Sequence, residues 1–313
     1  MSKKKTSKGA AVKRPEGKVI PLSFRDQWNP ISNIRSLLFL IVREVLDEQL
    51  MKDALDKLIR EHLPILGARI DASGPDGSLE YHLPHTFPEG YRLFEWSSKV
   101  VNKTFAEANV LPPVGKLDKI ATFFPSIPEM EAQWTPEAWP RERKDEVPDC
   151  AILLVHITHY KDATVVSTNL PHAVADQKGY ASLIEAWIEV MKGREPAEFM
   201  ELRDDELQGA DLPISELKKK EPKGLYRITN KKERAQVALG FALDVIPQPK
   251  ETRRTLLFSD AMVKNLRDKF NAEIKDKDGE GAMTLTNGDV ITAVLIKVCL
   301  RACVAHESMT NAA

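Results

Sequence analysis

Short runs of apolar and β-branched residues, separated by polar turns, predict several buried strands. Residues 37–42 form one such run, and residues 151–160 and 163–170 form two more with a two-residue polar turn between them. These last two runs predict a hairpin in the middle of a sheet. Shorter strands are expected around residues 66–70 and at 254–258.

Apolar residues that recur every three or four positions predict four helices. The first is capped by Asp47 and ends before Pro64, and the second follows a loop at residues 171–178 and stops at Gly193. A third is expected around residues 263–270, and the last is capped by Thr286. The buried face of the first helix is expected to carry Leu50, Ala54, Leu55, Leu58 and Ile59.

This order of strands and helices predicts an α/β protein with a mixed sheet. The basic residues 1–18 are expected to be a disordered tail, and residues 19–193 to form a first domain. The charged segment 194–253 is interpreted as a linker, and residues 254–313 as the start of a second domain. The proline-rich stretch 83–148 predicts loops and short strands.

Composition excludes several classes of function. The 313 residues carry a formal net charge of -1, so no global positive field would attract nucleic acid. No apolar run approaches the roughly 20 residues that span a bilayer, so no membrane partner is expected. Three cysteines in a chain without a secretion signal indicate a reducing compartment, with the cytoplasm as the default.

The segment 169–180 holds the best candidate for chemistry, the pair His172 and Asp176. It follows a predicted strand and precedes a helix, where side chains commonly project into a cleft. A neutral imidazole can take a proton from an alcohol or amine near pH 7, which makes His172 a candidate general base. Asp176 could hold that imidazole or pair with a cation. The competing interpretation is a loop histidine without a catalytic role.

Other common sites are not indicated. The chain has no Gly-x-Ser-x-Gly, no phosphate-binding Gly-x-x-x-x-Gly-Lys, no Gly-x-Gly-x-x-Gly and no His-Glu-x-x-His. His156 and His159 are three apart on a predicted strand, so their side chains are expected on opposite faces. No metal site is therefore predicted.

Four segments together resemble the BAHD-like acyltransferases, whose motif is His-x-x-x-Asp, especially fungal members of secondary metabolism. They are residues 21–27, residues 55–70, which end with the sequence PILGARI, residues 163–187 around His172, and residues 284–295 with TLTNGDVITAVL. The resemblance implies two similar α/β domains in a chloramphenicol-acetyltransferase-like architecture. It also implies His172 as catalytic base, and Asp176 as a structural residue that pairs with an arginine. Acyl-CoA would be the co-substrate, with no permanently bound cofactor, and the acceptor a small-molecule alcohol or amine.

The chain departs from the family pattern in two places. Gln177 and Lys178 precede Gly179, whereas the family usually has glycine directly after the motif aspartate. The sequence also ends at Ala313, before the family's Asp-Phe-Gly-Trp-Gly motif, so the second domain is expected to be incomplete. A catalytically silent remnant or binding module is thus an alternative. A condensation-type domain is disfavoured, because such domains commonly show two histidines where this chain has one.

Overall fold

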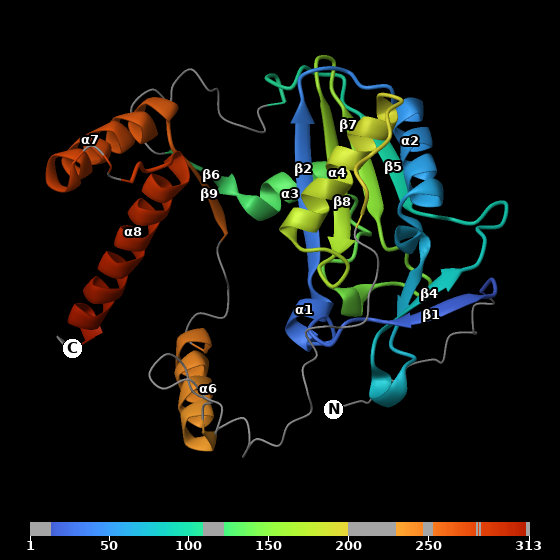
Figure 1. Cartoon of the computed structure of the whole chain (residues 1–313), viewed down its shortest axis with the longest axis horizontal. Helices are drawn as coiled ribbons and strands as arrows, with labels where there is room; N and C mark the ends of the chain where they lie inside the picture. Colours follow the sequence, from blue (N-terminus) through green and yellow to red (C-terminus); the bar gives the residue numbers. More distant parts are fainter. Residues whose placement is uncertain are drawn as a thin grey trace. The chain divides into compact units, whose positions relative to one another are not determined.

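The computed structural model describes residues 14–108, 122–199, 230–246, 253–279, 281 and 283–310. The chain divides into two compact units (Figure 1). Unit 1 comprises residues 1–108 and 131–251, and unit 2 comprises residues 109–130 and 252–313. Strands and helices alternate in unit 1, so the predicted mixed α/β class is confirmed. The domain boundaries expected from the sequence stay a prediction.

The main sheet of unit 1 has four strands in the order β2-β8-β7-β5. β7 and β8 form the predicted hairpin, β2 pairs antiparallel with β8, and β5 pairs parallel with β7. All eight residues of β8 are buried, as expected for a central strand covered on both faces. The bounds are β2 Arg35–Val42, β5 Glu95–Val100, β7 Leu154–His159 and β8 Thr164–Pro171.

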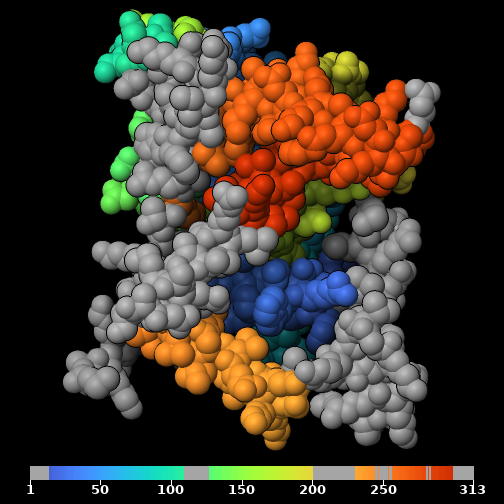
Figure 2. Space-filling model, turned by 90° about the vertical axis from the view of Figure 1, so that its left-hand side faces the viewer, coloured from blue at the N-terminus to red at the C-terminus, as the bar shows by residue number. Residues whose placement is uncertain are grey.

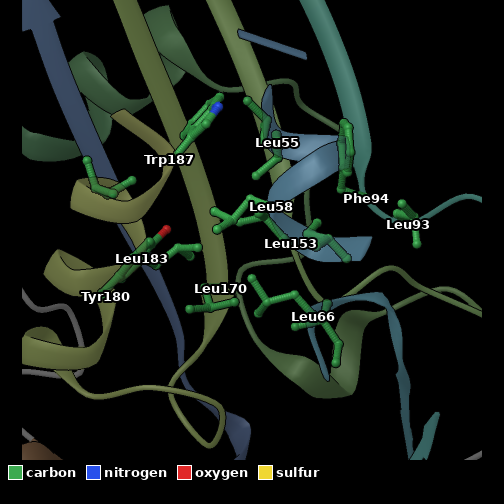
Figure 3. Packing of buried hydrophobic residues seen from close by; sticks show 14 of the residues in the cluster. Leu55, Leu58, Leu66, Leu93, Phe94, Leu153, Leu170, Tyr180, Leu183 and Trp187 are labelled. Atoms are coloured by element: carbon green, nitrogen blue, oxygen red, sulfur yellow. The ribbon is translucent and has the colours of Figure 1, made fainter. Parts of the chain in front are cut away.

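Two helices, α2 (Glu48–Glu61) and α4 (Gln177–Met191), cover one face of this sheet (Figure 1). Asp47 caps α2 as predicted, because its carboxylate accepts from the backbone N–H groups of Gln49 and Leu50. Leucine and aromatic side chains from both helices converge on the sheet (Figure 3). The residues that form this core include Leu55, Leu58, Leu66, Leu153, Leu170, Tyr180, Leu183 and Trp187.

The opposite face of the sheet carries more polar residues. In register across it lie Phe39 of β2, Ser167 of β8, His156 of β7 and Ser97 of β5. Trp134 lies on this face and its ring packs 5.5 Å from that of Phe39. His156 and His159 point to opposite faces as predicted, because His156 contacts Ser97 whereas His159 contacts Glu48 of α2.

A second, antiparallel sheet of unit 1 has the order β1-β4-β3. It lies beside the carboxyl end of α2, which leads into it through a short 3-10 helix at Pro64–Gly67. A tight approach of Gly67 to Phe87 and Leu93 leaves no room for a side chain there. The bounds are β1 Gly17–Pro21, β3 Arg69–Asp71 and β4 Glu80–Pro84, with the short helix α1 at Asn29–Asn33.

The described residues of unit 2 form a two-stranded antiparallel sheet and two helices. β6 (Thr122–Ser126) pairs with β9 (Arg254–Leu257), and the helices are α7 (Asp260–Asp278) and α8 (Asn287–Thr310). The orange surface of α7 adjoins the red surface of α8 (Figure 2). Thr286 and Asp289 satisfy each other's backbone N–H groups, so the predicted cap of the last helix is confirmed.

Several element predictions are wrong in detail. Leu50 is 51% exposed and Met51 occupies the buried face of α2 instead. The strand expected at 66–70 begins only at Arg69, because Pro64 starts a 3-10 turn. The third predicted helix, expected around residues 263–270, is longer and ends only at Asp278.

The linker and the proline-rich stretch also contain helices that the sequence did not indicate. Helix α6 (Lys231–Val245) lies within the segment interpreted as a linker and begins with a capping box at Asn230 and Glu233. Helix α3 (Ile127–Trp134) lies within the proline-rich stretch. Residues 1–13 of the basic tail and most of the segment 194–253 fall outside the described residues, whereas Gly17 and Lys18, at the end of that tail, begin strand β1. In the part of the chain that the structure describes, no helix is long and apolar enough to cross a membrane.

Candidate functional site

His172 is the first of five residues that connect the end of β8 to the start of α4 in a tight turn. Its backbone N–H donates to the Ile34 carbonyl oxygen at 2.9 Å, which extends the pairing of β2 and β8 by one residue. The Val174 N–H donates to the Pro171 carbonyl oxygen at 2.9 Å and closes the turn. His172 is half-buried, so its ring is held by the protein while retaining access to solvent.

The imidazole of His172 is oriented by the backbone of its own turn. Its Nδ1 lies 3.2 Å from the Ala175 carbonyl oxygen. A carbonyl oxygen only accepts hydrogen bonds, so the proton of the neutral ring must sit on Nδ1. Nε2 then carries the lone pair, which is the arrangement that a general base requires.

Asp176 does not contact the imidazole but caps helix α4. It is the N-cap residue, and its Oδ1 accepts from the Gly179 N–H at 2.8 Å. The Tyr180 N–H donates to the Asp176 carbonyl oxygen at 2.9 Å and begins the helical ladder. Because the cap fixes where α4 begins, it also fixes the preceding Ala175 carbonyl that receives the His172 proton.

Of the two roles that the sequence left open for Asp176, neither is seen in the described residues. No ion pair with an arginine or lysine is formed there, so the arginine partner implied by the resemblance stays a prediction. Helix capping explains the His-x-x-x-Asp spacing instead, since the cap comes one residue after the carbonyl that orients the ring. Gly179 suits this geometry, because an added Cβ would lie 3.2 Å from the Ala175 Cβ.

Two buried tyrosines place their hydroxyl groups beside the turn and the strand that leads into it. The Tyr81 hydroxyl lies 3.4 Å from the Ala173 carbonyl oxygen, and the Tyr180 hydroxyl donates to Thr168 Oγ1 at 2.6 Å. Burial raises the pKa of both phenols well above the usual value. Both tyrosines are therefore neutral donors at physiological pH, Tyr81 toward the turn and Tyr180 toward β8, and neither adds charge there.

Sequence reasoning missed a buried polar cluster next to this turn. Arg35 of β2 lies opposite Pro171 of β8, and its guanidinium contacts Asn169 and Glu146. The one available signal was a charged residue directly before an apolar strand, and this signal does not identify the partners. No group of three metal-ligating side chains occurs among the residues that the structure describes.

Comparison with known proteins identifies relatives in fungi. The chain is 27% identical over 270 residues to the acetyltransferase adrJ of Penicillium roqueforti, covering 83% of this chain and 52% of the relative. It is 26% identical over 309 residues to the acetyltransferase sphE of Aspergillus fumigatus, covering 91% of this chain and 58% of the relative. The chain is similar to fungal acetyltransferases. The resemblance predicted from its motifs is thus confirmed.

The chain spans about half the length of the curated relatives it matches. A shorter match, 28% identical over 58% of this chain and 36% of the relative, is to a protein of Sordaria araneosa named transcriptional regulator sdnM. No model of a known protein family matches the chain.

Solved structures give a weaker likeness. The crystal structure of TRI101 of F. sporotrichioides, complexed with coenzyme A and T-2, is 15% identical with a TM-score of 0.42. The match covers 59% of this chain and 41% of that chain. The incomplete second domain and the chloramphenicol-acetyltransferase-like arrangement of domains remain predictions of the motif resemblance.

Proposed function

We propose that the protein transfers an acyl group from an acyl-CoA to a hydroxyl or amine of a small molecule, with His172 as general base. The observation that supports this most directly is the contact between His172 Nδ1 and the Ala175 carbonyl oxygen, at 3.2 Å. It leaves Nε2 free to accept a proton. Asp176 supports the same arrangement through the cap of α4.

In the proposed reaction, His172 Nε2 removes the proton of the acceptor O–H or N–H as the nucleophile attacks the thioester carbonyl carbon. The resulting tetrahedral oxyanion collapses, the carbon–sulfur bond breaks, and coenzyme A leaves as its thiolate. The protonated imidazole then returns its proton to that thiolate, which restores the neutral ring. No covalent acyl-enzyme forms. The Cys150 thiol is poorly suited to that role, because burial raises its pKa.

The proposal extends to the protein as a whole. Acyl-CoA is the co-substrate, no permanently bound cofactor is required, and the two-domain architecture is the one implied by the motif resemblance. The acceptor can be an alcohol or an amine. The cytoplasm, inferred from cysteine content, stays the expected compartment.

The first test is turnover of acetyl-CoA in the presence of a panel of small alcohols and amines, followed by release of the coenzyme A thiol. Replacing His172 with Ala removes the base, and we expect thiol release to fall by about 100-fold or more. His85→Ala is the matched control, because His85 is exposed in a loop and, among the described residues, its side chain forms no hydrogen bond. A folded His172→Ala variant with the turnover of wild type would overturn the assignment.

The alternative to acyl transfer is a module that binds acyl-CoA without turnover. Isothermal titration with acetyl-CoA separates the two functions. Binding with thiol release supports the acyltransferase, whereas binding without thiol release for any acceptor supports a binding module.

A further inference from the structure

A buried ion pair lies next to the turn that carries His172. The side chain of Arg35 is 1% exposed and that of its partner Glu146 is 14% exposed. Arg35 Nε donates to Asn169 Oδ1 at 2.5 Å, and its Nη2 donates to the Ile152 carbonyl oxygen at 2.9 Å. Arg35 thereby ties β2 to β8 and to the residues before β7.

Residues 140–146, which we call the strap, contact the residues that directly precede Arg35. Asn33 forms two hydrogen bonds with the strap, donating to Glu142 Oε2 at 2.7 Å and accepting from the Lys144 N–H at 3.0 Å. Arg143 Nε donates to the Ser32 carbonyl oxygen at 2.9 Å. The backbone of Ile34 forms a β-bridge with Glu142.

These contacts hold Ile34, which is the residue that pairs with the backbone of His172. The Ile34 carbonyl oxygen accepts from the His172 N–H at 2.9 Å, and Ile34 stands between Asn33 and Arg35. On the facing strand, Asn169 receives Arg35 and donates from Nδ2 to the Pro140 carbonyl oxygen of the strap at 3.1 Å. The end of β8, which enters the turn, and the residue Ile34, which pairs with it, are therefore anchored to one cluster.

We propose that Arg35 and Glu146 are positioning residues for His172, because they fix the backbone that sets the direction of its ring. The expected effect on turnover rests on the proposed function, whereas the expected effect on the His172 ring does not. Arg35 and Glu146 do not touch the reacting atoms; they act through Ile34 and Asn169.

A contribution to the free energy of folding does not by itself explain why this ion pair is buried. Burying two charges costs free energy of desolvation, and replacing a buried ion pair by apolar residues of similar volume is often neutral or stabilising. Desolvation by burial is also the largest effect on Glu146 and raises the pKa of its carboxyl. The pair fixes relative position instead, because the planar guanidinium binds Asn169 of β8, Glu146 and the Ile152 carbonyl oxygen at the same time.

The decisive variant is therefore the double replacement Arg35→Met with Glu146→Met, which removes both charges and retains bulk. The first readout is the nitrogen NMR spectrum of the His172 ring in protein labelled with 15N-histidine, assigned with His172→Gln and recorded at alkaline pH. Wild type should show the tautomer with the proton on Nδ1. The double variant should fold with the thermal midpoint of wild type and show a mixture of tautomers.

The second readout is turnover with acetyl-CoA. A misplacement of about 1 Å in a catalytic group can cost about 100-fold, so kcat should fall by up to that factor while KM for acetyl-CoA stays unchanged. Glu146→Gln is the milder variant and should give a smaller change of the same kind. Glu189→Gln is the matched control, since Glu189 pairs with Arg194 on the exposed side of α4 and should change neither readout.

The outcomes are distinguishable from those of the proposed function. A folded double variant with the wild-type tautomer overturns the positioning role, whatever its turnover. If the double variant does not fold, Glu146→Gln decides by the same spectrum. A tautomer that shifts in a protein without any acetyl-CoA turnover upholds the positioning role while refuting acyl transfer.

Discussion

At the scale of single residues, replacing Asp176 distinguishes a structural role of the motif aspartate from an electrostatic one. Asn caps a helix as well as Asp does, so Asp176→Asn should retain both stability and turnover. Asp176→Ala loses the cap, which should lower the free energy of unfolding by about 1 kcal/mol and reduce turnover by freeing the His172 ring. Chemical denaturation and thiol release measure the two effects.

The control for that comparison is the cap of another helix. Asp47 caps α2 in the same way, so Asp47→Ala should lose similar stability and keep its turnover. An Asp176→Asn variant as inactive as His172→Ala would show that the carboxylate charge, and not the cap, is required.

His156 should make the stability of the protein depend on pH. Burial, and secondarily the charge of Lys99, lowers the pKa of His156 to about 4, and its Nε2 has no partner among the described residues. The unfolded chain takes up this proton near pH 6.5 and the folded chain only near pH 4. Stability should therefore fall as the pH drops through this window, by about 3 kcal/mol for this group.

The measurement is the free energy of unfolding in urea at several pH values between 4 and 7. The variant His156→Asn keeps a polar group near Ser97 and removes the titrating ring. Its stability should change less over this window than that of wild type, because all other groups titrate in both proteins. Equal slopes for the two proteins would contradict the assignment.

At the scale of secondary-structure elements, the sequence predicted best where periodicity and caps agree. The strands at β2, β7 and β8 and the helices at α2 and α4 were predicted because burial imposes a strong pattern on them. Helices α3 and α6 were missed, since prolines surround the first and α6 has no clear apolar stripe. The site was predicted only in part: His172 follows from its motif, whereas the Arg35 cluster joins residues over 100 positions apart.

Helix α2 offers a direct test of which face is buried. Leu58 is 0% exposed in the core of unit 1, whereas Leu50, which the periodicity placed on the same face, is largely exposed. Leu58→Ala should cost about 2 to 5 kcal/mol through the cavity it leaves. Leu50→Ala should cost less than about 0.5 kcal/mol. Thermal unfolding of the two variants checks this, and equal losses would restore the original prediction.

At the scale of the whole molecule, the two compact units should unfold as separate cooperative transitions. The main hydrophobic core consists entirely of residues of unit 1, and unit 2 has its own helices and a small sheet. Because unit 1 is compact and has its own core, it can fold alone, so its midpoint should differ from that of unit 2. Tryptophan fluorescence isolates one of them, because all five tryptophans lie in unit 1, at positions 28, 96, 134, 139 and 187.

The experiment follows thermal unfolding by tryptophan fluorescence and by far-ultraviolet circular dichroism on the same sample. Fluorescence should show one transition, and circular dichroism should show a second, because α7 and α8 contribute much of the helical signal. Leu58→Ala should move the fluorescence transition and leave the other in place, since the two units do not share that core. If the two signals coincide in wild type and shift together in the variant, the units unfold as one cooperative body.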